Sequence, residues 1–123
     1  MARADTGSVG RQAEKLALDH LKAQGLKEIT RNFRCRMGEV DLVMKDGDCL
    51  VFAEVRFRSR NNYASAVGSV DRHKQRKIIR TASAFLGLHP QYGNCVVRFD
   101  VIGLDKSGDQ TSLRWIRDAF RPQ

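Results

Sequence analysis

The chain has 123 residues, of which 41% are hydrophobic and 29% charged, the composition of one ordinary globular domain. We therefore expect a single domain over residues 1–123. Lys and Arg total 22 against 14 Asp and Glu, a net charge of +8 that favours an anionic partner. No apolar run approaches the roughly 18 residues of a membrane span, so we expect no membrane insertion.

The cysteines and the amino-terminal sequence predict a cytoplasmic protein. Cys35, Cys49 and Cys95 lack the spacing of a zinc site or a disulfide framework, so we expect free thiols. The first thirty residues alternate charged and apolar side chains and lack the continuous apolar stretch of an export signal.

The first predicted element is an amphipathic helix. From Gly10 onward, apolar residues recur at helical spacing until Gly25, which predicts a helix of roughly four turns that ends there. Residues 29–36 are mixed and polar and predict no regular element. The following residues 39–44 alternate with the period of a strand, which predicts that Glu39 and Asp41 share one face.

Residues 39–57 predict a β-hairpin. The Lys-Asp-Gly-Asp sequence at 45–48 is a turn signal, and residues 49–57 form an apolar, β-branched run typical of a second strand. Alternation on this strand places Glu54 at the head of a column of arginines on one face: Arg56, Arg58 and Arg60.

The rest of the chain predicts one more helix and one or two more strands. The sequence indicates a loop at 61–69, a helix marked by residues 78–86, a strand at 95–104, a polar turn at 105–110, and a strand or short helix at 113–120. This order predicts a mixed sheet with helices packed against it, of the α/β or α+β class.

Positive charge is concentrated between Glu54 and Arg80. This window holds eight basic and two acidic residues, so it carries +6 of the net +8. Clustered cations neutralise several phosphates at once, and counterion release makes such binding salt-dependent. We therefore predict nucleic acid as the partner. The alternative is that residues 72–80 are the solvated face of an ordinary amphipathic helix.

Three carboxylates fall on the predicted hairpin: Glu39 and Asp41 on one strand, Glu54 on the other. If their faces coincide, oxygen ligands converge beside fixed positive charge, as a site for Mg²⁺ or Mn²⁺ requires. Such a cation lowers the pKa of water and offsets phosphate charge, which is the chemistry of phosphodiester cleavage. The alternative is a structural hairpin whose acids pair with Arg56 and Arg58 for about 0.2–1 kcal/mol per pair.

Two motifs in the hairpin resemble the YraN-like bacterial proteins, a largely uncharacterised family. They are GEVDLV at 38–43 and LVFAEVRFR at 50–58. The resemblance extends over most of the chain, to Gly10, Glu14, residues 32–34, Lys74, residues 78–82 and residues 98–102.

That family is similar to the restriction-endonuclease-like nucleases, in particular the archaeal Holliday-junction resolvases, whose glutamate-x-lysine core binds Mg²⁺. The resemblance implies a central mixed β-sheet flanked by helices, with Asp41 and Glu54 as ligands of Mg²⁺ or Mn²⁺. It also implies Glu14 as the acid of the first helix and Glu39 as a neighbouring acid. Because resolvases act as dimers, it implies a homodimer.

The residue at position 56 departs from the nuclease pattern. Arg56 stands where the nucleases have lysine, and a guanidinium stays protonated, so it holds phosphate but accepts no proton. Three alternatives remain open at this point: the cation activates the water, a nearby lysine such as Lys74 substitutes, or the site binds without cutting.

The sequence thus predicts a metal-dependent endonuclease acting on DNA, including branched or structured DNA. Its catalytic residues are expected to be Glu14, Asp41, Glu54 and Arg56. The residues expected to bind flanking phosphates are Arg58, Arg60, Lys74, Arg76 and Lys77. The alternative is a nucleic-acid-binding protein that retains the nuclease fold without turnover.

Overall fold

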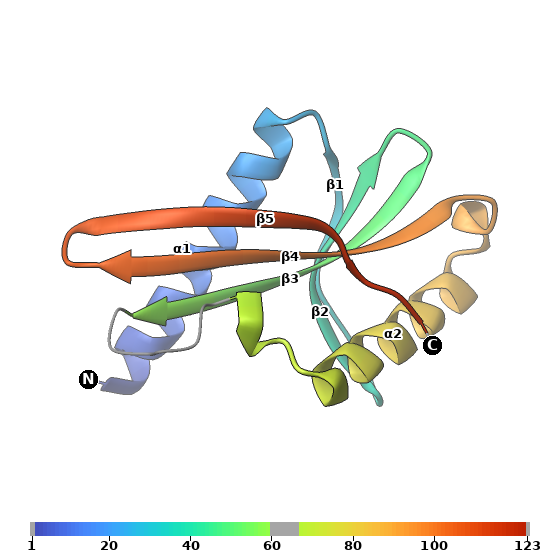
Figure 1. The fold of residues 1–123 in the computed structure, drawn as a ribbon. Helices are drawn as coiled ribbons and strands as arrows, with labels where there is room; N and C mark the ends of the chain where they lie inside the picture. Colours follow the sequence, from blue (N-terminus) through green and yellow to red (C-terminus); the bar gives the residue numbers. More distant parts are fainter. Residues whose placement is uncertain (1, 60–66, 123) are drawn as a thin grey trace.

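The structure, a computed structural model, describes residues 2–59 and 67–122, with side chains over 10–58 and 68–122 (Figure 1). The elements, in chain order, are α1 (Ala2–Ala23), β1 (Lys27–Cys35), β2 (Gly38–Asp46), β3 (Cys49–Ser59), the 3₁₀ turn η1 (Val67–Ser69), α2 (Arg72–Leu88), the 3₁₀ turn η2 (Pro90–Tyr92), β4 (Val96–Ser107) and β5 (Gln110–Phe120).

The strands of the described residues form one mixed sheet in the order β1-β2-β3-β4-β5. β3 and β4 are parallel, from the pair Cys49 and Val96 to the pair Ser59 and Lys106, and the other neighbours are antiparallel. The chain between the parallel strands contains α2, as a parallel connection requires. The predicted α/β class is confirmed, and the arrangement is consistent with a nuclease-like fold.

The two helices cover opposite faces of the sheet, and each face has its own apolar core (Figure 1). Ala17 and Leu21 of α1 pack in one core, and Ile78 and Phe85 of α2 pack in the other. Strand residues alternate between the two cores, as the neighbours Val51 and Phe52 do. No helix in the described part of the chain is both long and apolar enough to cross a membrane.

The predicted hairpin and its turn are present. β2 pairs with β3, and Gly47 in the turn has a φ of +58°, a conformation that favours glycine. The first helix ends before Gly25 as predicted, but it begins earlier than Gly10, at Ala2. The predicted loop at 61–69 lies mostly outside the described residues, and its last three form η1.

The strand β1 was missed by the sequence pattern. It lies at the edge of the sheet with β2 as its neighbour, and none of its side chains is fully buried. A bulge between Glu28 and Thr30 and a positive φ at Asn32 further interrupt its alternation. An edge strand of this kind has no period-two apolar pattern to read.

The last two strands are longer than predicted. β4 continues to Ser107 and β5 begins at Gln110, so the predicted six-residue turn is wrong. Gly108, with a φ of +62°, and Asp109 connect the two strands. The ambiguous segment at 113–120 is strand, because β4 supplies its hydrogen-bonding partner along most of its length.

The alternation of β2 changes direction near its start. Leu42 and Met44 pack in the core beneath α1, whereas Val40 packs with Val43 in the core beneath α2. The alternation predicted for residues 39–44 would place Val40 on the same face as Leu42 and Met44, so the prediction is wrong at this position. The break falls at Asp41.

Asp100 on β4 is fully buried and holds β5 to the sheet. Its carboxylate accepts hydrogen bonds from Arg98 Nε at 2.9 Å, Trp115 Nε1 at 2.9 Å and the backbone N–H of Asp118 at 3.0 Å. Asp118 has a φ of +54° and lies where the register between β4 and β5 shifts. The carboxylate thus satisfies the N–H group that this irregularity leaves unpaired.

We predict that Asp100→Ala lowers the free energy of unfolding by about 3–5 kcal/mol, because it leaves the Arg98 charge without its main partner. Urea denaturation monitored by the fluorescence of Trp115 measures the change. Asp19→Ala, which removes an exposed ion pair with Lys15, is the matched control and should cost less than about 0.5 kcal/mol. Equal effects of the two substitutions would contradict the prediction.

Candidate active site

Asp41 lies at the point where β2 and β3 separate. Their pairing extends from Asp46 and Cys49 to Leu42 and Ala53 and then stops. Beyond it, the backbone N–H of Val55 donates to Asp41 Oδ2 at 2.8 Å. A carboxylate therefore replaces the backbone partner that a continued ladder would supply, which explains why the alternation of β2 breaks at this residue.

Glu54 of β3 is buried beside Asp41, with only 3% of its surface exposed. Its Oε2 lies 3.4 Å from Lys74 Nζ and 3.6 Å from Arg56 Nη1. Its Oε1 is buried and has no hydrogen-bond partner among the residues that the structure describes. One oxygen of this carboxylate thus faces two cations, and the other lacks a partner.

Burial raises the pKa of both carboxyl groups. Burial and the charge of Glu54 raise the pKa of Asp41 to about 7, although the Val55 N–H opposes the shift. Burial also raises the pKa of Glu54, against the lowering effects of the Lys74 charge, a side-chain hydrogen bond with Asp41, and the Arg56 charge. The pair therefore retains a proton near neutral pH unless a further positive charge joins it.

Two further acids lie within electrostatic range of the pair. Partial burial and the charge of Asp41 raise the pKa of Glu14 on α1, while a hydrogen bond with Asn32 lowers it. Glu39 contributes to the raised pKa of both Glu14 and Asp41. Within the described ranges, no three Asp, Glu, His or Cys residues converge closely enough to hold a metal ion. The central donor set is therefore the pair Asp41 and Glu54.

Arg56 is held on two sides. Its Nε donates to Ser69 Oγ of η1 at 2.8 Å, and its Nη1 faces Glu54. About a quarter of the side chain, 27%, is exposed. The guanidinium is thus fixed beside the acidic pair while one edge remains accessible to a ligand.

Lys74 reaches the same carboxylate from α2. Asp71 caps the helix, because its side chain accepts the backbone N–H of Lys74 at 2.9 Å. This cap fixes Lys74 in the first turn of α2, so that its ammonium group lies next to Glu54. The sequence alone did not show which strand the helix would face.

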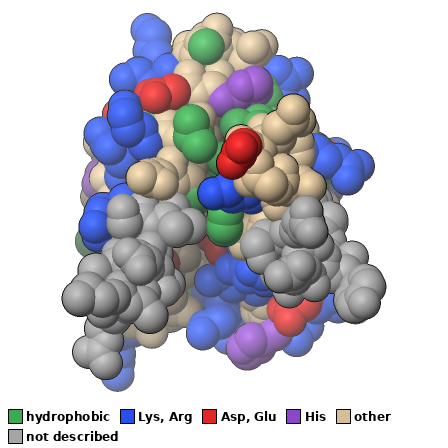
Figure 2. All heavy atoms as spheres, turned by 90° about the vertical axis from the view of Figure 1, so that its left-hand side faces the viewer, with side chains coloured by type: hydrophobic (Ala, Val, Ile, Leu, Met, Phe, Trp, Pro, Cys, Tyr) green, Lys and Arg blue, Asp and Glu red, His purple; other side chains and the backbone are tan. Residues whose placement is uncertain are grey.

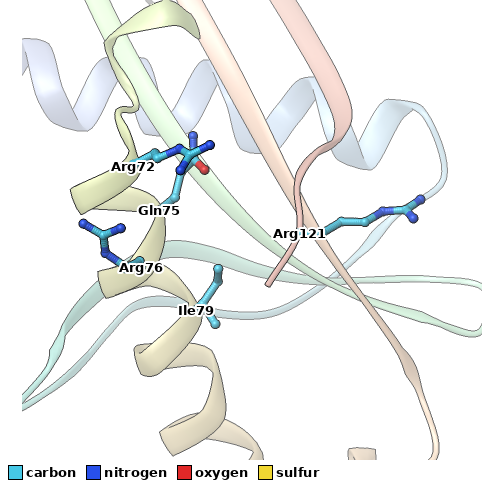
Figure 3. Close-up of a pocket in the computed structure, with 5 residues that line it drawn as sticks. All are labelled: Arg72, Gln75, Arg76, Ile79 and Arg121. Carbon is cyan, nitrogen blue, oxygen red and sulfur yellow. The ribbon is translucent and has the colours of Figure 1, made fainter. Parts of the chain in front are cut away.

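The remaining predicted basic residues occupy separate places. Lys77 lines a groove together with Lys74, but Arg76 lies on another flank of α2, at a hollow of about 240 Å³ (Figure 3). Arg58 donates to the backbone oxygen of Phe57 at 3.1 Å. Arg60 lies outside the described residues.

Two basic residues that sequence reasoning missed join these surfaces. Arg34 of β1 lines the groove with Lys77, and Arg121, after β5, lines the hollow with Arg76. In Figure 3 the guanidinium of Arg121 is turned away from α2, and it pairs with Asp118. Neither residue lies in the basic window of the sequence between Glu54 and Arg80. Only the fold brings them close to basic residues of that window.

Basic side chains are distributed widely over the side of the molecule where β3 ends. Figure 2 shows this side of the molecule, where Lys and Arg outnumber Asp and Glu. α2 itself carries no Asp or Glu and holds these basic residues: Arg72, Lys74, Arg76, Lys77 and Arg80. An anionic ligand would therefore meet positive charge around a small acidic centre.

The acidic centre fits a hard divalent cation. Mg²⁺ binds through one or two carboxylates and keeps several water ligands, so Asp41 and Glu54 are a sufficient protein donor set. The unpartnered, buried Oε1 of Glu54 is the oxygen that such a cation would satisfy.

Without a divalent cation, ionisation of Asp41 should destabilise the fold. Folding raises the pKa of Asp41 from 3.8 to about 7. The contribution of protonated Asp41 to the stability of the fold is therefore fully present below pH 3.8 and is lost as the pH rises through 7. We expect Asp41→Asn to raise the free energy of unfolding above pH 7 by about 2–4 kcal/mol, since one pKa unit corresponds to about 1.4 kcal/mol.

Urea denaturation in EDTA across this pH range tests the expectation. Asp48→Asn, at an exposed position in the β2–β3 turn, is the control and should leave the pH profile unchanged. A profile for Asp41→Asn that matches the wild type would show that Asp41 does not carry the pH dependence.

Comparison with known proteins places this chain among uncharacterised relatives. The model of the uncharacterised protein family UPF0102 matches residues 13–104, a range that contains Glu14, Asp41, Glu54 and Lys74.

Three relatives, each named only as a UPF0102 protein, match nearly the whole chain. The protein of Alcanivorax borkumensis is 46% identical, and the match covers 92% of this chain and 91% of that protein. That of Stutzerimonas stutzeri is 47% identical, with 94% and 97% covered. That of Halorhodospira halophila is 45% identical, with 98% and 93% covered. The chain therefore belongs to the UPF0102 family, the uncharacterised YraN-like bacterial proteins that its hairpin motifs resemble.

Proposed function

We propose that this protein is a Mg²⁺- or Mn²⁺-dependent endonuclease that hydrolyses phosphodiester bonds in DNA, including branched or structured DNA. The observation that carries the proposal is the buried pair Asp41 and Glu54, in which Glu54 Oε2 faces two cations and Oε1 has no partner among residues 2–59 and 67–122. A buried carboxylate oxygen without a partner is costly unless a proton or a cation meets it, and a divalent cation would satisfy it while both carboxylates are ionised.

In this proposal, Asp41 and Glu54 would hold the cation, and Glu14 would add negative charge to the acidic centre from α1. When bound, the cation lowers the pKa of a water ligand and offsets charge on the phosphate. Arg56 would contact a non-bridging phosphate oxygen, because its guanidinium is fixed by Ser69 and stays charged. Arg58, Arg60, Lys74, Arg76 and Lys77 would bind flanking phosphates.

The position of Lys74 bears on the missing lysine at position 56. Its ammonium group lies 3.4 Å from Glu54 Oε2, slightly closer than the guanidinium of Arg56 at 3.6 Å. The site therefore contains a lysine next to its buried glutamate, supplied by α2 instead of β3. This arrangement supports turnover despite the arginine.

Divalent cations should stabilise the fold, and more strongly at higher pH. Cation binding requires ionised carboxylates, and the raised pKa of Asp41 and Glu54 makes protons compete with the metal. At Mg²⁺ or Mn²⁺ concentrations about 100 times the dissociation constant, we expect about 2.7 kcal/mol of stabilisation well above pH 7.

Thermal unfolding with and without each cation, near pH 5 and near pH 8, measures this effect. The stabilisation should nearly vanish near pH 5, and Glu54→Gln should abolish it at both values. Asp19→Asn, far from the pair in sequence and exposed, should retain it. A cation effect that persists in Glu54→Gln would place the cation elsewhere.

Cleavage of labelled DNA tests the activity itself. We expect Mg²⁺- or Mn²⁺-dependent cutting of at least one substrate in a panel of single strands, duplexes and four-way junctions. Asp41→Asn and Glu54→Gln should reduce it by more than about 100-fold, since even residues that only hydrogen-bond to a metal's ligands contribute about 10–100-fold. Lys27→Ala, at the far end of β1, should retain activity.

A second candidate is a nucleic-acid-binding protein without turnover, and Arg56 favours it because arginine accepts no proton. This candidate predicts salt-dependent DNA binding with no cutting of any substrate in the panel. Arg56→Lys should then create cleavage activity in a protein that otherwise only binds. Cutting by the wild-type protein would exclude this candidate.

A further inference from the structure

A groove of about 400 Å³ lies between the β1–β2 hairpin and α2. Its size falls in the range of about 300–1,000 Å³ that is usual for ligand sites. It is lined by Arg34, Cys35, Gly38, Glu39, Lys74 and Lys77.

The groove is predominantly positive. It has three cations, Arg34, Lys74 and Lys77, against the single carboxylate of Glu39, which lies 3.3 Å from Arg34 Nε. The Arg34 side chain is 76% exposed, so this ion pair is weak and leaves the guanidinium available to a stronger anion. Over the part of the chain that the structure describes, Lys77 has no ion-pair partner.

The groove is connected to the acidic pair through Lys74. Its side chain lines the groove, and its Nζ lies 3.4 Å from Glu54 Oε2. An anionic ligand in the groove would therefore lie beside the candidate active site, with Lys74 next to both.

Close packing fixes the two walls of the groove. Gly38 has a φ of +147°, and a Cβ atom at this position would lie 3.2 Å from Thr81 Oγ1. Thr81 is fully buried and donates from Oγ1 to the backbone oxygen of Lys77 at 2.8 Å. The hairpin thus contacts α2 directly through a glycine, and the groove exists before any ligand binds.

We propose that this groove binds the sugar-phosphate backbone of the nucleic acid immediately beside the phosphate at the acidic pair, with Arg34 and Lys77 as its phosphate contacts. The inference rests on the proposed function and extends it by naming the surface that carries the substrate strand. A polyanion fits better than a single anion, because the cations are spread from the hairpin to α2.

The native cysteines provide a test that needs no catalysis. Cys35 lines the groove, Cys49 lines a different hollow, and Cys95 lines neither, while all three are free and partly buried. The rates of thiol alkylation are measured by peptide mass spectrometry in EDTA. A short oligodeoxynucleotide, as single strand or duplex, should slow alkylation of Cys35 several-fold and leave Cys49 and Cys95 unchanged.

Two variants and a control connect protection to the phosphate contacts. Arg34→Ala and Lys77→Ala should each reduce the dependence of log affinity on log salt concentration by about one and weaken protection of Cys35. Lys27→Ala, on the same strand as Arg34 but at its other end, should change neither. Inorganic phosphate should protect Cys35 far less than the oligonucleotide, because it contacts fewer of the cations.

Two outcomes distinguish failure of the groove proposal from failure of the proposed function. Oligonucleotide binding without protection of Cys35, or equal protection by inorganic phosphate, would overturn the proposed role of the groove even if the protein cuts DNA. Protection of Cys35 in a protein that cuts no substrate would support the groove and overturn the hydrolytic activity. No oligonucleotide binding would overturn both.

Discussion

The local structure of the site depends on the burial of two carboxyl groups where β2 and β3 separate. Two ionised carboxylates in such a place repel each other and lose hydration, so each needs compensating contacts. Asp41 has the Val55 N–H, and Glu54 has Lys74 and Arg56. Within the described part of the chain, these contacts leave Glu54 Oε1 unsatisfied. That imbalance is the physical basis for expecting a cation.

The mixed topology of the sheet determines which charges meet the acidic pair. β3 and β4 are parallel, so the chain must return along the sheet between them, and α2 packs on one face as it does so. The first turn of α2 consequently lies near the middle of β3, where Lys74 contacts Glu54. An antiparallel β3–β4 pair could be joined by a tight turn and would not need this helix.

The arrangement also changes the interpretation of Arg56, which follows Glu54 by two residues on β3. Judged along β3 alone, Arg56 replaces the lysine expected of a nuclease and argues against turnover. In three dimensions the ammonium group of Lys74 lies at a comparable distance from the same carboxylate. Both candidate functions, hydrolysis and binding without cutting, therefore require the acidic pair. They differ in the chemistry expected of Lys74 and Arg56 beside Glu54.

Much of the fold could be predicted from local patterns, because a strand or helix that buries one face has a periodic sequence. The β2–β3 hairpin, its Asp-Gly turn, the second helix and the α/β class were predicted correctly. β1 was not, because an edge strand with a bulge at Ile29 and a positive φ at Asn32 has no clean alternation. The orientation of Val40 was also wrong, since the side chain of Asp41 turns to Val55 and interrupts the period.

The sequence by itself determined the residue types of the site: two acids on neighbouring strands, an arginine after the glutamate, and a strongly basic helix. Only the tertiary structure decided their partners. It placed Lys74 against Glu54, Ser69 against Arg56, and Arg34 across a groove from Lys77, while it put Arg76 on another flank of α2. The physical reason is that charge and periodicity are local properties of the chain, whereas contacts between residues far apart in sequence depend on strand order and helix packing.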